Sequence, residues 1–171
     1  MITYVKAENK AYLMTKFLDT KNVSFNQVGN DQILLRYADV LLMYAEALNE
    51  LGYDASEGSI ALKQLNATRT RAGLTKLTAA DVPTQESFRK AILDERQKEF
   101  PYEGHRWFDL VRMGYAKSVL AAQGLNIQDY QLLFPIPQTE IEKVGDSKIL
   151  WQKSGFEKLK RSKPSWHSSL L

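Results

Sequence analysis

Carboxylates, arginines and large aromatic rings are concentrated between residues 94 and 112 of the 171-residue sequence. Within this segment Glu95 and Glu99 are four positions apart, so a helix would project both carboxylates from one face. Paired carboxylates are the groups that perform acid–base work on a glycosidic bond. Hydrolysis of a glycoside is therefore one chemistry that these residue types could support.

The same segment also has a structural interpretation, because each acid has a basic neighbour within helical reach. The pairs at i, i+3 spacing are Glu103 with Arg106, Arg106 with Asp109, and Asp109 with Arg112. Arg96 can reach Glu99 or Glu103. A carboxylate beside an arginine generally has a lowered pKa, which suits an ion pair and not a general acid. We therefore predict a structural ion-pair network, no catalytic residue and no enzymatic activity.

Two other residues of the segment could have a functional role. His105 has no cysteine, nearby second histidine or serine-nucleophile motif to work with, so we expect it to be packed and hydrogen-bonded. Trp107 could stack on a sugar ring. With Leu110 and Val111 following, however, Trp107 and Phe108 are more typical of core anchors.

Ligand contacts elsewhere are less specifically indicated. Exposed aromatic faces are one way to bind a sugar, and the weak candidates on that basis are Tyr53, Tyr130 and Trp151. Polar residues of the segment 32–51 could line a groove, although capping and pairing between helices are more typical roles; they are Arg36, Tyr37, Asp39, Glu46 and Glu50.

Composition excludes several classes of site and of protein. The chain has no cysteine, which excludes disulfides, thiol nucleophiles and cysteine-ligated metals, and it has only two histidines. We therefore expect no metal and no cofactor. No apolar run reaches the ~18 residues of a membrane-spanning helix. The N-terminus does not resemble a secretory signal, and without a cysteine the chain cannot carry a lipid-attachment box.

The net charge of +3 is unevenly distributed. Residues 153–171 carry a net +4, whereas residues 1–152 hold 18 basic and 19 acidic side chains. The body of the chain is thus nearly neutral and lacks the basic footprint that nucleic-acid binding needs. Nucleic acid is not an expected partner.

The most strongly patterned element is a helix predicted over residues 32–51. Asp31 is its expected N-cap and Gly52 its expected C-terminal glycine. One apolar stripe, at 3.6-residue spacing, is formed by Leu34, Ala38, Leu41, Ala45 and Leu48. Further apolar residues widen this stripe to most of the circumference, which predicts a helix buried between neighbours. One hairpin cannot cover so much apolar surface, so the isolated chain is expected to expose part of it.

Other helices are predicted on both sides of the segment 94–112. A helix over 57–72 would form an antiparallel, tetratricopeptide-like hairpin with the first, facing inward through Ile60, Ala61, Leu65, Thr68 and Ala72. Basic Arg69 and Arg71 would complement its dipole. Further helices are expected from 84 or 85 to about 100, over 103–113 and over 114–124, before an extended stretch at 134–137 and a helical turn at 139–142.

These elements predict a mainly α fold: a tetratricopeptide-like hairpin, further helices and an irregular C-terminal segment with little strand. Three parts are expected along the chain. Residues 1–30 form an irregular lead-in, residues 31–156 a helical domain, and residues 157–171 a basic tail that we expect to be disordered.

Several of these segments together resemble the C-terminal region of the SusD/RagB family of nutrient-binding outer-membrane lipoproteins. The segments that carry the resemblance are residues 35–47, 66–74, 95–100, 103–110, 133–137 and 140–141. They occur in the order typical of the family, and the resemblance covers about residues 30–156.

The resemblance implies an α-helical, non-catalytic component of a TonB-dependent uptake system of Bacteroidetes-type bacteria. The implied partners are a SusC-like TonB-dependent transporter and an oligosaccharide or other nutrient. The implied location is the cell surface at the outer membrane, held by a lipid anchor that this chain lacks. Family members are considerably longer, so we carry over no ligand-binding residue. A helical protein–protein interaction scaffold without its own ligand site is the alternative.

Overall fold

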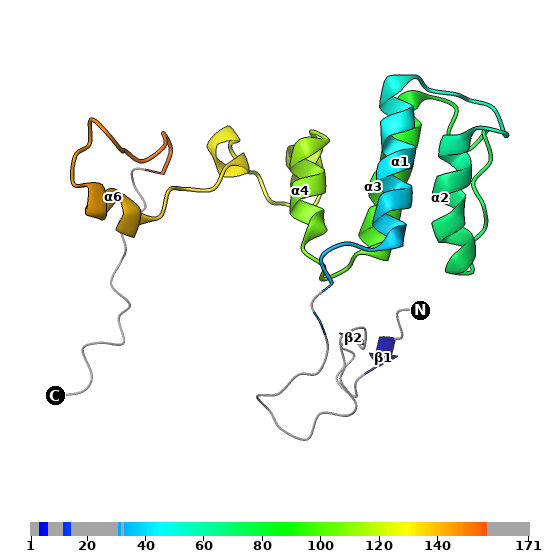
Figure 1. Ribbon diagram of the computed structural model, residues 1–171, viewed down its shortest axis with the longest axis horizontal. Helices are drawn as coiled ribbons and strands as arrows, with labels where there is room; N and C mark the ends of the chain where they lie inside the picture. Colours follow the sequence, from blue (N-terminus) through cyan, green and yellow to red (C-terminus); the bar gives the residue numbers. More distant parts are fainter. Residues whose placement is uncertain (1–3, 7–11, 15–30, 32, 157–171) are drawn as a thin grey trace. The chain divides into compact units, whose positions relative to one another are not determined.

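The computed structural model describes residues 4–6, 12–14, 31 and 33–156, and it is mainly α-helical as predicted (Figure 1). The described helices are α1 (Tyr37–Leu51), α2 (Ile60–Arg71), α3 (Gln85–Glu99), α4 (His105–Arg112), α5 (Ala116–Ala121), the 3-10 helix η1 (Asp129–Leu132) and α6 (Gln138–Val144). Two short strands, β1 (Tyr4–Lys6) and β2 (Tyr12–Met14), pair antiparallel with Val5 opposite Leu13.

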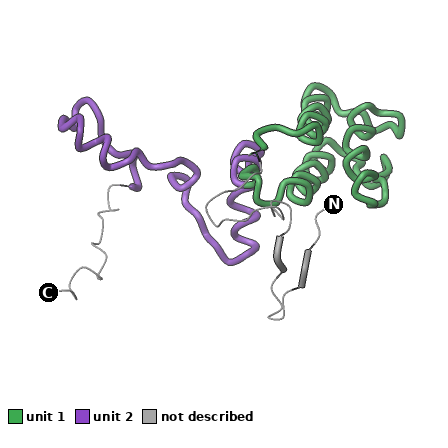
Figure 2. Tube along the Cα trace, turned by 60° about the horizontal axis from the view of Figure 1, so that its bottom comes forward, with its two compact units in different colours: residues 1–106 green, residues 107–171 purple. Residues whose placement is uncertain are grey.

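The chain divides into two compact units, residues 1–106 and residues 107–171 (Figure 2). In the first unit α1, α2 and α3 lie side by side, and α1 contacts both of the others (Figures 1 and 2). The end of α1 lies beside the start of α3, where the Gln85 amide donates to the Asn49 carbonyl at 2.7 Å. The C-terminal ends of α2 and α3 meet through Arg69 and Glu95. Hence α1 runs antiparallel to α2 and α3, which confirms the predicted hairpin.

A loop over residues 73–84 returns the chain from the end of α2 to the start of α3. The side-chain amide of Asn66 fixes this loop by donating to the Leu77 carbonyl and accepting from the Leu77 backbone N–H, both at 2.8 Å. The Tyr53 hydroxyl donates to the Val82 carbonyl at the other end of the loop. Because buried backbone groups need partners, these two side chains allow the loop to pack against the helices without secondary structure of its own.

The core of the first unit lies between these three helices and the loop. Its buried apolar side chains are Leu42, Ala45, Ala61, Leu62, Leu65, Val82, Phe88, Ile92, Leu93 and Phe100. Each large side chain among them contributes roughly 1.5–3 kcal/mol by leaving water. Charged residues share this interior, because Glu95, Arg96 and Glu99 of α3 are also buried.

The predicted start of α1 was wrong by five residues. The helix begins at Tyr37, and Asp31 does not cap it. Arg36 holds the N-cap position with an extended backbone (φ −127°, ψ 157°) and no side-chain cap. Its guanidinium instead bonds to Glu99 and Glu103, which fixes the chain in an extended form just before the helix. The predicted end at Gly52 is confirmed by its backbone N–H, which donates to Leu48.

The buried face of α1 does not coincide with the apolar stripe identified in the sequence. Only Ala45 of that stripe is buried, and Leu34, which precedes the helix, is 82% exposed. The buried face is formed by Asp39, Leu42, Ala45 and Asn49. Asp39 has its ion-pair partner on α3, so the helix turns its polar residues inward and leaves apolar ones in water.

The other two long helices follow their sequence signals more closely. α2 begins after Ser59, whose hydroxyl accepts from the Leu62 N–H at 3.1 Å, and α3 begins with a capping box between Thr84 and Ser87. Pro101 follows directly on the last turn of α3. On α2 the prediction of inward residues was right for Ala61, Leu65 and Thr68 but wrong for Ile60, which is 51% exposed, and for Ala72.

The second unit contains most of α4, then α5, η1 and α6, with the extended stretch at 134–137 that its prolines predicted. The Gln152 amide pairs with both backbone groups of Ile136, at 2.8 and 3.0 Å. Gly155 has φ +91°, and a Cβ there would lie 2.3 Å from the Tyr130 ring, so this position requires glycine. The Tyr130 ring also meets Phe156 edge-on, with centroids 5.0 Å apart.

The prediction for Phe108 was also wrong. It was expected to be a core anchor but is 60% exposed, whereas Trp107 is half-buried. The predicted tail, 157–171, lies outside the described residues, as does most of the predicted lead-in, 1–30.

Candidate functional site

Arg36, directly before α1, binds the C-terminal end of α3 and the turn that follows it. Its Nε and Nη2 atoms donate to the two carboxylate oxygens of Glu103, both at 2.9 Å, and Nη1 donates to Glu99 Oε1 at 2.8 Å. Nη2 also donates to the Glu99 carbonyl at 2.9 Å. A forked guanidinium matches a carboxylate in this two-pronged geometry, which makes the contact directional as well as charged.

Phe100 lies where these charged groups converge. The guanidinium carbons of Arg36 and Arg96 are 4.7 and 5.0 Å from the centre of its ring, within the range of a cation–π contact. The His105 ring packs at a centroid distance of 4.9 Å, and its Nδ1 lies 3.5 Å from Arg96 Nη2. His105 is thus packed and placed by its neighbours, as the sequence predicted.

The most deeply buried ion pair joins α1 to α3. Arg96 Nη1 donates to Asp39 Oδ1 at 2.6 Å, and the two side chains are 4% and 7% exposed. Removing two charges from water costs several kcal/mol per ion, so such a pair persists only where geometry and further hydrogen bonds compensate. The pair therefore fixes how α1 is rotated against α3.

α2 contributes two more arginines to the same network. Arg69 Nη1 donates to Glu95 Oε2 at 2.9 Å, and Arg71 Nη2 donates to Glu99 Oε2 at 2.5 Å. The sequence placed Arg69 and Arg71 at the helix end for its dipole and did not identify their partners. Those partners lie 26 and 28 positions away, beyond the reach of any helical spacing rule.

The arrangement favours structure over catalysis. Glu95 and Glu99 do project from one helix face, but that face is turned into the protein, where their side chains are only 2% and 7% exposed. Each carboxylate is already bound by arginine. A glycosidase requires two carboxyl groups that reach a substrate from either side of its bond. These two carboxylates instead bind α2 and the segment before α1 to α3. In the second unit, Asp109 and Arg112 form the predicted i, i+3 pair at 2.9 Å.

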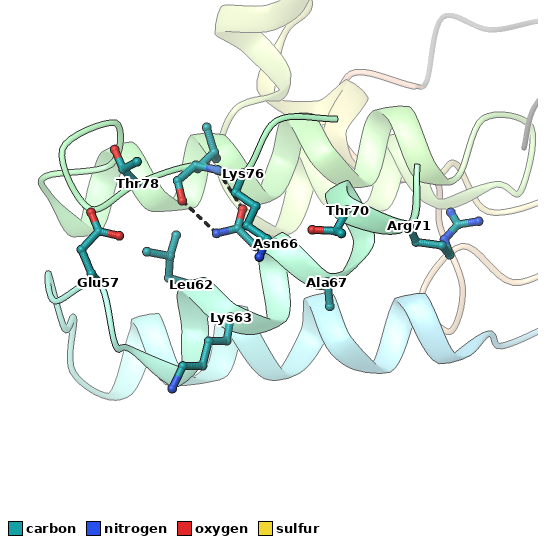
Figure 3. Close-up of a pocket in the computed structure, with 10 residues that line it drawn as sticks. Glu57, Leu62, Lys63, Asn66, Ala67, Thr70, Arg71, Lys76 and Thr78 are labelled. Carbon is teal, nitrogen blue, oxygen red and sulfur yellow. Dashed lines mark hydrogen bonds between the residues drawn. The ribbon is translucent and has the colours of Figure 1, made fainter. Parts of the chain in front are cut away.

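A surface groove lies along α2, under the loop that follows it (Figure 3). Its volume is about 670 Å³. The lining residues are Glu57, Leu62, Lys63, Asn66, Ala67, Thr70, Arg71, Lys76, Leu77 and Thr78. In Figure 3, Glu57 and Thr78 stand at one end and Arg71 at the other, while the Asn66 amide bonds to the loop between them. Sequence reasoning did not find this groove, because the loop forms one of its sides.

A second groove of about 490 Å³ lies within the C-terminal unit. It is lined by Trp107, Phe108, Val111, Arg112, Leu132, Leu133, Phe134 and Lys153. The Phe108 and Phe134 rings lie 6.4 Å apart, and Phe134 is 64% exposed. Apolar and aromatic side chains dominate this groove, and Arg112 and Lys153 are its charged lining residues.

The three aromatic residues named as ligand candidates occupy different environments. Tyr53, in the first unit, is half-buried, packs 6.0 Å from Phe88 and donates its hydroxyl to the Val82 carbonyl. Burial also raises the pKa of the Tyr53 hydroxyl. Tyr130 and Trp151 belong to the second unit, where Tyr130 packs on Phe156 and Trp151 is 63% exposed. Of the three, Trp151 presents the most accessible ring.

Outside the buried network, a more accessible ion pair joins the end of α1 to the start of α3. Arg89 donates to both oxygens of Glu50 at 2.5 Å. These hydrogen bonds hold the pKa of the Glu50 carboxyl below its usual value. Over the residues that the structure describes, no cluster of histidine and carboxylate side chains could hold a metal ion, and no helix is long and apolar enough to cross a membrane.

Comparison with known proteins gives consistent matches to one family. The profile of the SusD family matches residues 3–156. SusD-like protein P2 of Formosa agariphila is 34% identical over 140 residues, which are 75% of this chain and 26% of that protein. SusD-like proteins P25 and P38 of the same organism are 35% and 33% identical over 73% and 67% of the chain. The chain spans about a quarter of the length of these relatives, and no solved structure gives a significant match.

Proposed function

The chain belongs to the SusD family, and from that premise we propose that it is part of a nutrient-binding component of an outer-membrane uptake system. The ligand class proposed is an oligosaccharide, bound without chemical change. A SusC-like TonB-dependent transporter is the proposed partner, and the cell surface at the outer membrane, with attachment through a lipid anchor, is the proposed location.

The observation that carries this proposal is the family match over residues 3–156. The geometry of the carboxylates adds to it, since arginines bind Glu95 and Glu99 in the interior and leave them engaged in packing. A binding component needs a rigid scaffold that displays side chains, and a helical unit joined by buried ion pairs is of that kind. The ion-pair network therefore supports a non-catalytic role.

Two surfaces of the described structure have features that suit a sugar. Trp151 offers an exposed ring face of the sort that stacks on pyranose rings. The groove beside α2 offers the Thr70 hydroxyl and the Lys63 and Lys76 ammonium groups, which can donate hydrogen bonds to sugar hydroxyls. We propose Trp151 as the first choice and the groove as the second, and the two can be distinguished by substitution.

Isothermal titration of the chain against a panel of oligosaccharides tests the proposal. We expect binding of at least one glycan, weakened several-fold by Trp151→Ala and unchanged by Ile149→Ala, which removes a neighbouring exposed side chain without a ring. Weakening by Lys76→Ala instead would assign the ligand to the groove. If full-length SusD-like protein P2 binds a glycan and this chain binds none, the site lies outside residues 1–171.

A protein–protein interaction scaffold is the alternative function. It is favoured by the large apolar side chains that the second unit exposes, including Phe108, Leu133 and Phe134. Capture of a TonB-dependent transporter by the chain, with no glycan bound in the titrations, would support it over the nutrient-binding proposal.

A further inference from the structure

The side of α1 that faces away from α2 and α3 is apolar along its whole length. We call this side the outer face of α1; it consists of Tyr37, Val40, Tyr44, Ala47 and Leu51, and all five are exposed. The exposed fractions are 75% for Tyr37, 46% for Tyr44 and 87% for Leu51. None of the charged residues of α1 lies on this face, since Asp39, Glu46 and Glu50 fall on other sides of the helix.

This composition is the reverse of that of an ordinary surface helix, which turns its apolar stripe to the core and its polar residues to water. Single exposed apolar side chains are common in folded proteins, but a continuous row along four turns marks a surface that another molecule or segment covers. The flanks extend the row, because Met43 is 43% exposed and Leu34, just before the helix, is 82% exposed.

The spacing of the row indicates what covers it. Successive members of the outer face are separated by three, four, three and four positions, which is the pattern by which one helix packs along another. From Tyr37 to Leu51 the row is roughly 21 Å long, at 1.5 Å per residue, which matches a helix of about four turns. Apart from the two tyrosine hydroxyls, the outer face has no polar side-chain group to bind a sugar or the backbone of an extended peptide.

We propose that the outer face of α1 is the packing surface for a further amphipathic helix, which the remainder of a full-length SusD-like protein supplies. The chain spans only 23–26% of the length of its relatives, so about three quarters of such a protein lies outside it. Helical hairpins that cannot bury both faces alone are stable when a neighbouring hairpin covers the open face. The covering helix should place small apolar residues opposite Tyr37 and Tyr44.

A second copy of this chain fits the outer face less well. In an antiparallel pair of α1 helices centred on Tyr44, each Tyr44 would meet its own copy and each Leu51 would meet Tyr37. Large side chains would then face large ones, whereas well-packed helix pairs alternate large with small.

The test compares one substitution in two contexts. The first context is the 171-residue chain, and the second is a chimera in which the chain replaces the matching segment of SusD-like protein P2. Tyr44→Glu and Leu51→Glu place a carboxylate on the outer face, and Gln97→Glu, on an exposed position of α3, is the matched control. Melting temperature, hydrophobic-dye binding and light scattering are measured for each.

We expect the outer-face substitutions to lower the melting temperature of the chimera by at least about 5 °C, since they bury an unpaired charge. In the isolated chain they should leave the melting temperature within about 1 °C and reduce dye binding, because exposed substitutions away from special features have little effect on stability. Gln97→Glu should leave the melting temperature of both proteins unchanged. If the chimera does not fold, the same substitutions at the aligned positions of intact P2 replace it.

Three results would overturn the proposal. An unchanged melting temperature in the chimera or in P2 would show that the outer face is not packed in the longer protein. An isolated chain that is dimeric, and becomes monomeric with Tyr44→Glu, would identify a second copy as the occupant. A large loss of melting temperature in the monomeric isolated chain would show that another segment of the same chain covers the face.

Discussion

The two faces of α1 differ in a way that hydropathy does not predict. The inner face carries Asp39 and Asn49, which are 5% and 1% exposed, together with Leu42 and Ala45. The outer face carries Tyr37, Tyr44 and Leu51, which are between 46% and 87% exposed. On the inner face Asp39 pairs with Arg96 of α3, and the Asn49 side-chain N–H donates to the Gln85 carbonyl. The large apolar side chains of the outer face are instead left exposed.

This contrast shows that a side chain of α1 is buried where another element supplies a hydrogen-bond or ion-pair partner, whether or not the side chain is polar. Asp39 lies inside because Arg96 of α3 is there to bind it, and Asn49 lies inside because the Gln85 carbonyl accepts from its amide at 3.3 Å. A helix can therefore bury charge if a second helix supplies the counter-charge. The apolar outer face is the surface on which we propose that a further helix packs.

The largest loss of stability should come from removing one partner of the buried ion pair on the inner face of α1. Arg96→Met leaves Asp39 as an uncompensated charge in the interior, so we expect the free energy of unfolding to fall by about 3–5 kcal/mol. Denaturant titration followed by circular dichroism measures this loss.

The double variant Asp39→Leu/Arg96→Met is the control for that experiment. Because an apolar pair of similar size is often no less stable than a buried ion pair, it should recover most of the lost stability. A double variant as unstable as Arg96→Met would mean that the arginine stabilises the fold through Phe100 and not through Asp39.

A second experiment makes the same substitution, leucine to alanine, on the inner and on the outer face of α1. Leu42→Ala removes a fully buried side chain and should cost about 2–5 kcal/mol, from lost burial and the cavity that remains. Leu51→Ala, at an 87% exposed position of the same helix, should change stability by no more than about 0.5 kcal/mol. Equal losses from the two variants would contradict the assignment of inner and outer faces.

A third variant tests whether the buried carboxylates are structural. Glu99→Gln keeps the shape of the side chain but weakens its contacts with Arg36 and Arg71, so a loss of roughly 1–3 kcal/mol is expected. Reducing-end assays on the glycan panel should detect no bond cleavage by the parent chain or the variant. Cleavage by the parent that disappears in a variant of unchanged melting temperature would instead make Glu99 catalytic.

The smallest change in stability is expected from the partly exposed ion pair between Arg89 and Glu50. The folded-state pKa of Glu50 lies below its ordinary value of 4.5, so the pair stabilises the fold above about pH 4.5 and loses that effect as pH falls through the folded-state pKa. Arg89→Gln should therefore lower the melting temperature slightly at pH 7, and this difference should shrink as pH falls below 4.5.

Salt provides the control for the exposed pair. Both side chains are partly exposed, so the difference between the parent and Arg89→Gln should shrink in 1 M salt. A difference that does not shrink as pH is lowered, or that grows with salt, would show that Arg89 acts through packing and not through the charge of Glu50.

Local sequence signals located most helix ends, although not the start of α1. The Thr84–Ser87 capping box lies at the predicted start of α3, Pro101 follows its last turn, and Gly52 ends α1. Such signals operate within three or four residues, so they are complete in the sequence itself.

The sequence predicted that the candidate site is an ion-pair network, but not which residues pair across helices. The spacing of Glu95 and Glu99 gave their common face, but their partners Arg69, Arg71 and Arg36 come from elements far along the chain. Spacing rules cover neighbours on one helix, whereas these contacts depend on how α1, α2 and α3 pack. The groove beside α2 was missed for the same reason.

The sequence alone determined which segments are helical, the family to which the chain belongs, and the surplus of apolar residues around α1. Only the tertiary structure decided which side of α1 is inside. Its circumference offers two faces that helical periodicity cannot rank, and the choice depends on Arg96, 57 positions from Asp39. Because a buried charge is stable only beside its counter-charge, the position of that arginine in space sets the rotation of the helix.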